Sequence, residues 1–413
     1  MTVSMANSDI HPLEQLDGSA ETAEIVESFR SLTNDAGSSD AASPGAVSPD
    51  AESTETISTD AAPSNAPYPW ILHPVLDLAF GCGGIVWLLF AIHTFILNQG
   101  GVIPQALVSM SAIGVIVFAE THTASTFLVV YRNADVRSKF AFYTKWLALA
   151  CVLLALAGMT IPGVTPILVK IYLLMVPHHF IAQTFGIAML YCMKRGYKLS
   201  NWERETIKFF LRSVTWFAVL RQLTFQEWSG TSFLTVPIPF WGPLPIWMCT
   251  ASEYSMLFSA ALLCVLVLVR TVRTGEMLPV PVQLTILTGV SAFVLGPVAT
   301  GFFWLYVSAY YHGAQYLMVV TAQRIKENGL PEGMPASKIA GQLFRAPALR
   351  FLAMTALVSF GIYTCVPQAL LSTGIDFAMS AAVIFTTVNF FHIITDGAIW
   401  KLRDPKVRAQ LVA

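Results

Sequence analysis

The sequence predicts an all-α fold, a polytopic transmembrane bundle of about ten helices that follows a disordered N-terminal tail. Three observations predict it. Of the 413 residues, 55% are hydrophobic and only 12% are charged, whereas about 25% of the residues of a soluble domain are charged. The apolar residues gather in segments of roughly the length that crosses a membrane. The Lys and Arg residues gather in alternate connections between these segments.

Two physically different pieces join near Pro67. Residues 1–66 hold twelve acidic side chains and one basic side chain, for a net charge of −11. Because such a segment cannot bury enough apolar area to offset its chain entropy, we expect a disordered cytoplasmic tail. An acidic tail is also a candidate binding site for a protein partner. Residues 67–413 carry a net charge of +10 and form the predicted transmembrane helical domain.

Ten apolar segments follow the tail. About 20 apolar residues cross a hydrocarbon core of roughly 30 Å, so several of the longer segments are expected to tilt or protrude. The fifth segment contains Lys208, Arg212 and Arg221, which also fits a tilted amphipathic helix at the membrane surface. The expected segments are 74–97, 104–131, 142–160, 165–193, 206–225, 254–270, 280–297, 302–323, 350–370 and 377–400.

The charges of the connections predict the topology. Cations follow each even-numbered segment, for example Arg132 after the second and Lys194 after the fourth. The other connections hold no Lys or Arg; they are 98–103, 161–164, 226–253, 298–301 and 371–376. This alternation is the positive-inside pattern, and it predicts a protein of the bacterial inner membrane with both termini in the cytoplasm.

Several classes of function find no supporting residues. The six cysteines are scattered singly without a CxxC spacing, so neither a thiolate zinc site nor a disulfide framework is indicated. HExxH, Walker, GxSxG and GxGxxG signatures are absent, which leaves the common hydrolase and nucleotide-binding functions without a motif. No basic patch with interleaved aromatic residues points to nucleic acid.

Five histidines inside the even-numbered segments are the central feature. His178 and His179 lie in VPHHFIAQTFGIAMLYCMKR, and the others are His122, His312 and His392. Ionisable side chains are costly in hydrocarbon, so an intramembrane histidine is a functional-site hypothesis by default. Counted from the cytoplasmic ends at 1.5 Å per residue, all five lie at a depth of roughly 12 to 22 Å. Imidazoles in one depth band can converge in the bundle interior, where helical bundles build metal sites.

These histidines are candidate metal ligands. Imidazole suits iron, zinc, copper or nickel. We expect His178, His179, His312 and His392 to be the metal ligands in the first place, and His122 is a fifth candidate. A single histidine in a membrane helix also serves as a packing or hydrogen-bonding residue. Four helices that share one depth band favour the metal site.

Polar side chains accompany the histidines, either beside them or within one helical turn. They are Glu120, Gln183, Gln315 and Asp396. A ligating histidine usually donates its other N–H group to a carboxylate or a carbonyl oxygen, which fixes the tautomer and the ring orientation. We therefore expect these four side chains to hold the rings around a cofactor.

Three segments carry a resemblance to known proteins. HHFIAQTFGIAMLY, YYHGAQYLMVV and NFFHIITDGAIWKLRDP resemble motifs of bacterial polytopic membrane proteins with intramembrane histidines. More loosely, His122 in an early segment and the pair His178 and His179 in a later one are similar in distribution to those of Brp/Blh-type carotene-cleaving oxygenases. Those proteins are membrane helical bundles that hold one iron ion through histidines of several spans. The spacing departs from that family. The resemblance implies iron-dependent oxidation of an isoprenoid.

The first hypothesis is therefore an integral-membrane oxidoreductase with a histidine-ligated metal ion, non-haem iron, that acts on a lipid or isoprenoid entering from the bilayer. Haem is a variant, because paired histidines on facing helices can hold its iron axially. One alternative is a proton-coupled transporter in which the same histidines and Asp396 relay protons or bind a solute. Another is a membrane scaffold or assembly protein whose acidic tail recruits a partner. Only the first hypothesis requires a stoichiometric metal.

Overall fold

The computed structural model describes residues 68–97, 104–132, 134–295, 297–328 and 336–400. The predicted disordered tail, residues 1–66, lies outside the described residues. The described residues are almost entirely helical, and their strands are the two-residue elements β1 (Ser232–Phe233) and β2 (Val236–Pro237). The all-α class is therefore confirmed.

Each of the ten predicted segments coincides with one or more helices. The first half of the domain contains α2 (Pro74–Leu76), η1 (Asp77–Gly81), α3 (Gly84–Phe95), α4 (Gln105–Gly114), η2 (Val115–Ala119), α5 (Glu120–Tyr131), α6 (Ala134–Lys139), η3 (Phe142–Leu147), α7 (Ala148–Thr160), α8 (Val164–Lys194), α9 (Asn201–Thr224) and α10 (Gln226–Ser229). The second half contains α11 (Ile246–Thr274), α12 (Val280–Val294), α13 (Pro297–Tyr306), η4 (Val307–Gly313), α14 (Ala314–Glu327), η5 (Ala336–Phe344), α15 (Ala346–Phe360), η6 (Gly361–Cys365), α16 (Val366–Leu371) and α17 (Phe377–Ile399).

Among the described residues, six uninterrupted helical stretches are long and apolar enough to cross a membrane. They are Gln105–Tyr131, Phe142–Thr160, Val164–Lys194, Ile246–Thr274, Ala346–Leu371 and Phe377–Ile399. The bent pair Pro74–Gly81 and Gly84–Phe95 is a seventh span if it counts as one. These stretches mark the chain as a membrane protein. The count of ten spans stays a prediction.

The first segment is broken rather than continuous. Its two parts meet at an angle of 59°, and Gly83 at the break has a φ of 80°. Thr288 of α12 fastens the break, because its Oγ1 donates to the carbonyl of Cys82 at 2.8 Å and accepts from Trp87 Nε1 at 2.8 Å. A side chain at Gly83 would meet Thr288 as well as adopt a left-handed backbone, so glycine is required here.

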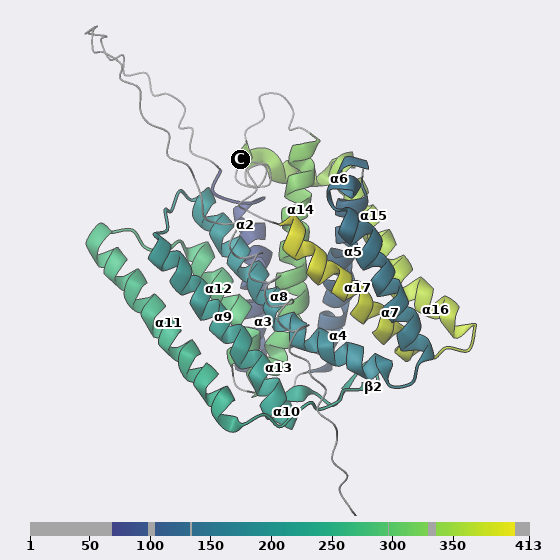
Figure 1. Ribbon diagram of the computed structural model, residues 1–413. Helices are drawn as coiled ribbons and strands as arrows, with labels where there is room; N and C mark the ends of the chain where they lie inside the picture. Colours follow the sequence, from purple (N-terminus) through teal and green to yellow (C-terminus); the bar gives the residue numbers. More distant parts are fainter. Residues whose placement is uncertain (1–67, 98–103, 133, 296, 329–335, 401–413) are drawn as a thin grey trace, which may run out of the picture. The chain divides into compact units, whose positions relative to one another are not determined.

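The centre of the bundle is formed by α8 and α14 (Figure 1). α8 packs against α9, α12 and α17, whereas α11 contacts α9 at the margin. In α14 every residue from 314 to 322 is buried, which is the signature of a helix enclosed on all sides. α17 packs against α5, α7 and α8. This arrangement places α5, α8, η4 and α17 around one interior volume.

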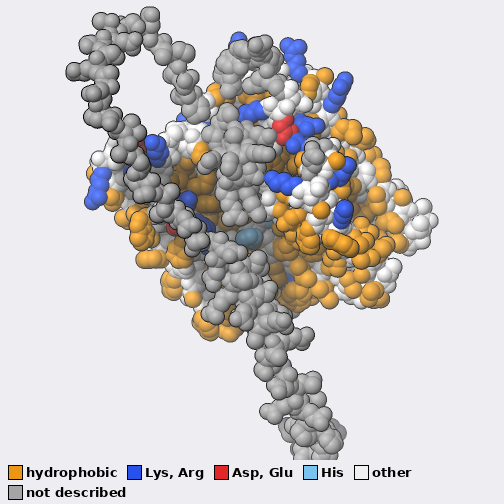
Figure 2. Space-filling model, turned by 45° about the horizontal axis from the view of Figure 1, so that its top comes forward, with side chains coloured by type: hydrophobic (Ala, Val, Ile, Leu, Met, Phe, Trp, Pro, Cys, Tyr) orange, Lys and Arg blue, Asp and Glu red, His pale blue; other side chains and the backbone are white. Residues whose placement is uncertain are grey.

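Cations gather at the ends of the even-numbered segments, and ion pairs join these ends. Arg132 after α5 pairs with Glu327 of α14, and Arg270 of α11 pairs with Glu203 of α9 at 2.8 Å. Figure 2 shows Lys and Arg side chains gathered toward one end, with hydrophobic side chains over the flanks. This distribution is the one that the positive-inside pattern requires. Which end faces the cytoplasm stays a prediction.

Candidate metal centre

Four buried histidines from four elements meet in the bundle interior. They are His122 of α5, His179 of α8, His312 of η4 and His392 of α17. One ring nitrogen of each lies within 4.8 Å of the corresponding nitrogens of the others. Nε2 of His179 and Nε2 of His392 lie 3.0 Å apart. The structure therefore brings four of the five predicted ligands together.

The rings contact one another edge to face. The ring centroid of His122 lies 5.0 Å from that of His312 and 4.6 Å from that of His392. The ring centroid of His179 lies 4.8 Å from that of His312 and 4.8 Å from that of His392. Phe180 stacks on His312 with a centroid distance of 3.9 Å. Each of the four imidazole rings therefore contacts two others, and the phenyl ring of Phe180 stacks on the ring of His312.

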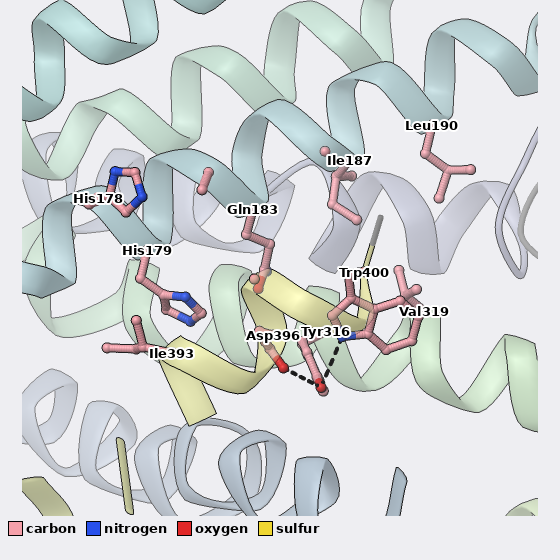
Figure 3. A pocket seen from close by; sticks show the side chains of 13 residues that line it. His178, His179, Gln183, Ile187, Leu190, Tyr316, Val319, Ile393, Asp396 and Trp400 are labelled. Atoms are coloured by element: carbon pink, nitrogen blue, oxygen red, sulfur yellow. Dashed lines mark hydrogen bonds between the residues drawn. The ribbon is translucent and has the colours of Figure 1, made fainter. Parts of the chain in front are cut away.

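His178 differs from the expectation. It was predicted to be a first ligand, but it is exposed and does not belong to the group of four. Adjacent residues of an α-helix point in directions about 100° apart, so His178 and His179 cannot both face one interior site. Figure 3 shows the two rings directed away from each other on α8. The fourth position is taken by His122, the candidate that was expected to come fifth.

Two π-helical segments position His122 and His312. His312 lies inside η4, and His122 follows η2 by three residues. These two segments pack against each other, and Gly313 makes the close approach possible because a Cβ there would lie 2.7 Å from the carbonyl oxygen of Phe118. π-helical segments inside α-helices occur frequently at functional sites.

The ring nitrogens leave room for a ligand. Both nitrogens of His312 are buried and have no hydrogen-bond partner among the described residues. The same holds for His122, whose ring lies near the carbonyl groups of Phe118 and Ala119. Leaving a buried polar atom unpaired costs about 1–3 kcal/mol. Bonds from a metal ion to imidazole nitrogen are about 2.0–2.1 Å, so two nitrogens bound to one ion lie at most about 4.2 Å apart. The four ring nitrogens lie within 4.8 Å of one another, so small shifts of the side chains would let them share one ion. The four residues fit a metal ion.

His392 is held by a network of hydroxyl and carboxylate groups. Its Nδ1 lies 2.8 Å from Thr126 Oγ1, and its Nε2 lies 3.5 Å from Oδ2 of Asp396. Oδ1 of Asp396 accepts from Tyr316 Oη at 2.9 Å, and that hydroxyl accepts from Trp400 Nε1 at 3.1 Å. Asp396 was expected to orient His392 through the nitrogen that faces away from the metal. The structure gives that role to Thr126 and places Asp396 beside the nitrogen that faces His179.

The predicted glutamines act on the backbone rather than on a ring. Gln183 Nε2 donates to the carbonyl of His312 at 2.9 Å and to Oε1 of Gln315 at 2.9 Å. Gln315 Nε2 donates to the carbonyl of Gly81 at 2.7 Å. These bonds join η4 and α14 to α8, and α14 to η1. Glu120, beside His122 in the sequence, makes no hydrogen bond to the four histidines.

A pocket of about 220 Å³ opens beside the histidines, between α8, α14 and α17 (Figure 3). Its polar lining includes His179, Asp396 and Tyr316, so the candidate metal site forms part of its wall. Most of the other described lining residues are apolar, and none of the lining residues that the structure describes is Lys or Arg. The lining residues are His178, His179, Ala182, Gln183, Gly186, Ile187, Leu190, Tyr316, Val319, Ile393, Asp396, Gly397 and Trp400.

Sequence inspection missed Thr126, Tyr316 and Trp400. Thr126 and Tyr316 each follow one of the histidines by four residues, which is the spacing that joins His392 to Asp396. That spacing was the available signal. Trp400 has no such relation to a histidine of the group.

Comparison of the chain with models of known protein families, with curated proteins and with solved structures finds no match. The fold and the site define a class nonetheless. The chain is a helical membrane protein with four buried histidines that could hold a metal ion.

Proposed function

We propose that the protein is an integral-membrane oxidoreductase that binds non-haem iron through His122, His179, His312 and His392 and acts on a lipid or isoprenoid. The observation that carries this proposal is the convergence of four buried imidazoles beside an apolar pocket. Imidazole ligands with a nearby carboxylate, here Asp396, are typical of non-haem iron sites. The ring centroids of neighbouring histidines are only 4.6 to 5.0 Å apart, which leaves no room for a porphyrin between them. This geometry favours non-haem iron over haem.

The protein side chains have distinct roles in this proposal. A bound redox-active metal ion supplies one-electron and oxygen chemistry. Phe180 covers the His312 ring and helps to exclude water from the site. Tyr316 donates a hydrogen bond to Asp396, which lines the pocket and lies beside His392. We assign to this pair the transfer of a proton between the site and a substrate in the pocket.

We further propose that the protein lies in a bacterial inner membrane. Ten spans in a bacterial inner membrane, with both termini in the cytoplasm, would place the histidines between the inner leaflet and the midplane. The cations at the ends of α5, α8, α11 and α14 support this orientation. The similarity in histidine distribution to Brp/Blh-type oxygenases supports the choice of an isoprenoid or related lipid as the substrate.

The experiment is a product search with the full chain. The protein is reconstituted in lipid nanodiscs, loaded with Fe²⁺, and incubated with a bacterial membrane lipid extract under air and under argon. We expect mass spectrometry to detect an oxygen-dependent lipid product that the His312→Ala variant does not form. Iron-loaded wild-type protein that changes no lipid and reduces no oxygen would contradict the oxidoreductase proposal and favour a proton-coupled carrier.

A further inference from the structure

Two glycines line the pocket without a structural need for glycine. Gly186 of α8 and Gly397 of α17 are both lining residues. Neither has a positive φ, and a Cβ added at either position would meet no described atom within 4 Å. Glycine inside a helix costs about 0.5–1 kcal/mol relative to alanine. Neither the backbone conformation nor packing explains these glycines, and each leaves open space beside the pocket.

The mouth of this pocket lies between two membrane helices. Ala182, His178 and Gly397 are exposed lining residues, and they belong to α8 and α17, which are both long and apolar enough to span a membrane. Figure 3 shows these two helices on either side of the pocket. A molecule dissolved in the bilayer would therefore enter sideways between α8 and α17.

The lining defines the chemistry of that molecule. Ile187, Leu190, Val319 and Ile393 supply an apolar wall, and the described lining residues include no cation to pair with an anionic headgroup. An apolar cavity of about 150 Å³ already binds benzene, so about 220 Å³ accommodates a segment of an apolar chain. The polar groups of the wall, with His179 among them, belong to the histidine site.

We propose that Gly186 and Gly397 are specificity-determining residues that keep the pocket open for the apolar chain, alkyl or isoprenyl, of an uncharged membrane lipid. This inference rests on the proposed function, because it makes the chain the reacting part of the substrate beside His179. The pocket and the metal can nevertheless be measured separately.

The test uses two uncharged photoreactive probes, hexadecanol and geranylgeraniol, each carrying a diazirine in the chain. Wild-type protein in nanodiscs is irradiated with each probe, and labelled peptides are mapped by mass spectrometry. We expect label on peptides of α8 and α17. Gly186→Leu and Gly397→Leu should reduce it at least about tenfold, because one methylene in an apolar pocket already changes discrimination by roughly 10 to 200-fold. The probe that labels more strongly distinguishes an alkyl from an isoprenyl chain.

Gly361→Leu is the matched control. Gly361 of η6 also has nothing within 4 Å of an added Cβ, but it does not line the pocket. It should keep the label, and all three variants should keep the metal content of the wild type. If a leucine variant fails to fold, Gly186→Ala replaces it, and its added methyl group should lower labelling at an unfolding temperature no lower than that of the wild type, because alanine favours the helix.

The outcomes separate the two proposals. Label that is absent from α8 and α17 in the wild type, or unchanged in both pocket variants, would overturn the inference even in a protein that contains iron. Label that is lost in the pocket variants of a metal-free protein would support the chain-binding pocket and overturn the proposed function alone.

Discussion

The four histidines share a local pattern that builds a second polar layer. Each is followed four residues later by a polar side chain; these are Thr126, Gln183, Tyr316 and Asp396. Four residues advance about one helical turn, so the polar side chains lie one turn beyond the imidazoles. Thr126, Tyr316 and Asp396 bond to one another at 2.9 to 3.3 Å. These bonds satisfy the hydroxyl and carboxylate groups of Thr126, Tyr316 and Asp396 in the buried environment beside the four histidines.

The first prediction compares two histidines of one helix. His179→Ala removes a candidate ligand and should lower bound metal severely, whereas His178→Ala changes an exposed residue outside the group and should leave the metal content unchanged. Elemental analysis of both purified variants measures the difference, and thermal unfolding confirms that both are folded. Equal metal loss in the two variants would contradict the assignment of the ligands.

The second prediction concerns the carboxylate. Asp396→Asn keeps the size of the side chain and a hydrogen-bonding oxygen but removes the charge near His392. Loss of a group that supports a metal ligand typically reduces metal affinity or activity about 10 to 100-fold. Competition with a chelator of known affinity measures the change. Asp376→Asn is the control, because Asp376 caps the other end of α17. If the Asp396→Asn variant binds the metal as tightly as the wild type does, Asp396 does not support the metal ligands.

At the scale of elements, the contact between η2 and η4 fixes two of the four histidines. A Cβ at Gly313 would lie 2.7 Å from the carbonyl oxygen of Phe118 and 3.0 Å from Cα of Ala119. Both are backbone atoms, so the elements must separate if the glycine is replaced. The distance between His122 and His312 would then increase.

The third prediction follows from this contact. Gly313→Ala should lower the free energy of unfolding by about 1–3 kcal/mol, the usual cost of overpacking, and should also lower metal occupancy. Gly361→Ala is the control, because an added Cβ there meets nothing within 4 Å. Thermal unfolding and elemental analysis of both variants give the readouts. A Gly313→Ala variant as stable and as metal-rich as the control would show that the contact does not position the histidines.

Hydropathy predicted the helices because each of the ten apolar segments contains enough apolar residues to demand burial in a bundle or in lipid. It also predicted the common depth of the histidines, since depth depends only on position along a helix. The rotation of a helix about its axis depends on packing, so the sequence could not separate His178 from His179. The π-helical turns η2 and η4 have no signature in the sequence. Thr126 and Tyr316 carry no charge, so neither stood out from ordinary membrane-helix residues.

At the scale of the whole molecule, charge determines the orientation in the membrane. The ion pairs Arg132–Glu327 and Arg270–Glu203 lie at the ends where the cations gather. If this side is cytoplasmic, the exposed Thr274 at the end of α11 faces the cytoplasm, and the exposed Thr231 in the connection between α9 and α11 faces the outside.

The fourth prediction tests this orientation with an impermeant thiol reagent added to intact cells. In a background that lacks the exposed Cys264 and Cys365, Thr231→Cys should react and Thr274→Cys should react only after the cells are opened. The reverse pattern would invert the orientation and place the histidines in the outer half of the membrane.

The metal content of the wild-type protein tests the central claim most directly. The protein is purified without chelators and analysed by inductively coupled plasma mass spectrometry against its measured protein concentration. Because four imidazoles converge on one volume, we predict about one metal ion per chain, with iron as the main element. Protein that is folded yet contains no iron, copper, zinc or nickel at near-stoichiometric level would contradict the metal centre and the oxidoreductase built on it.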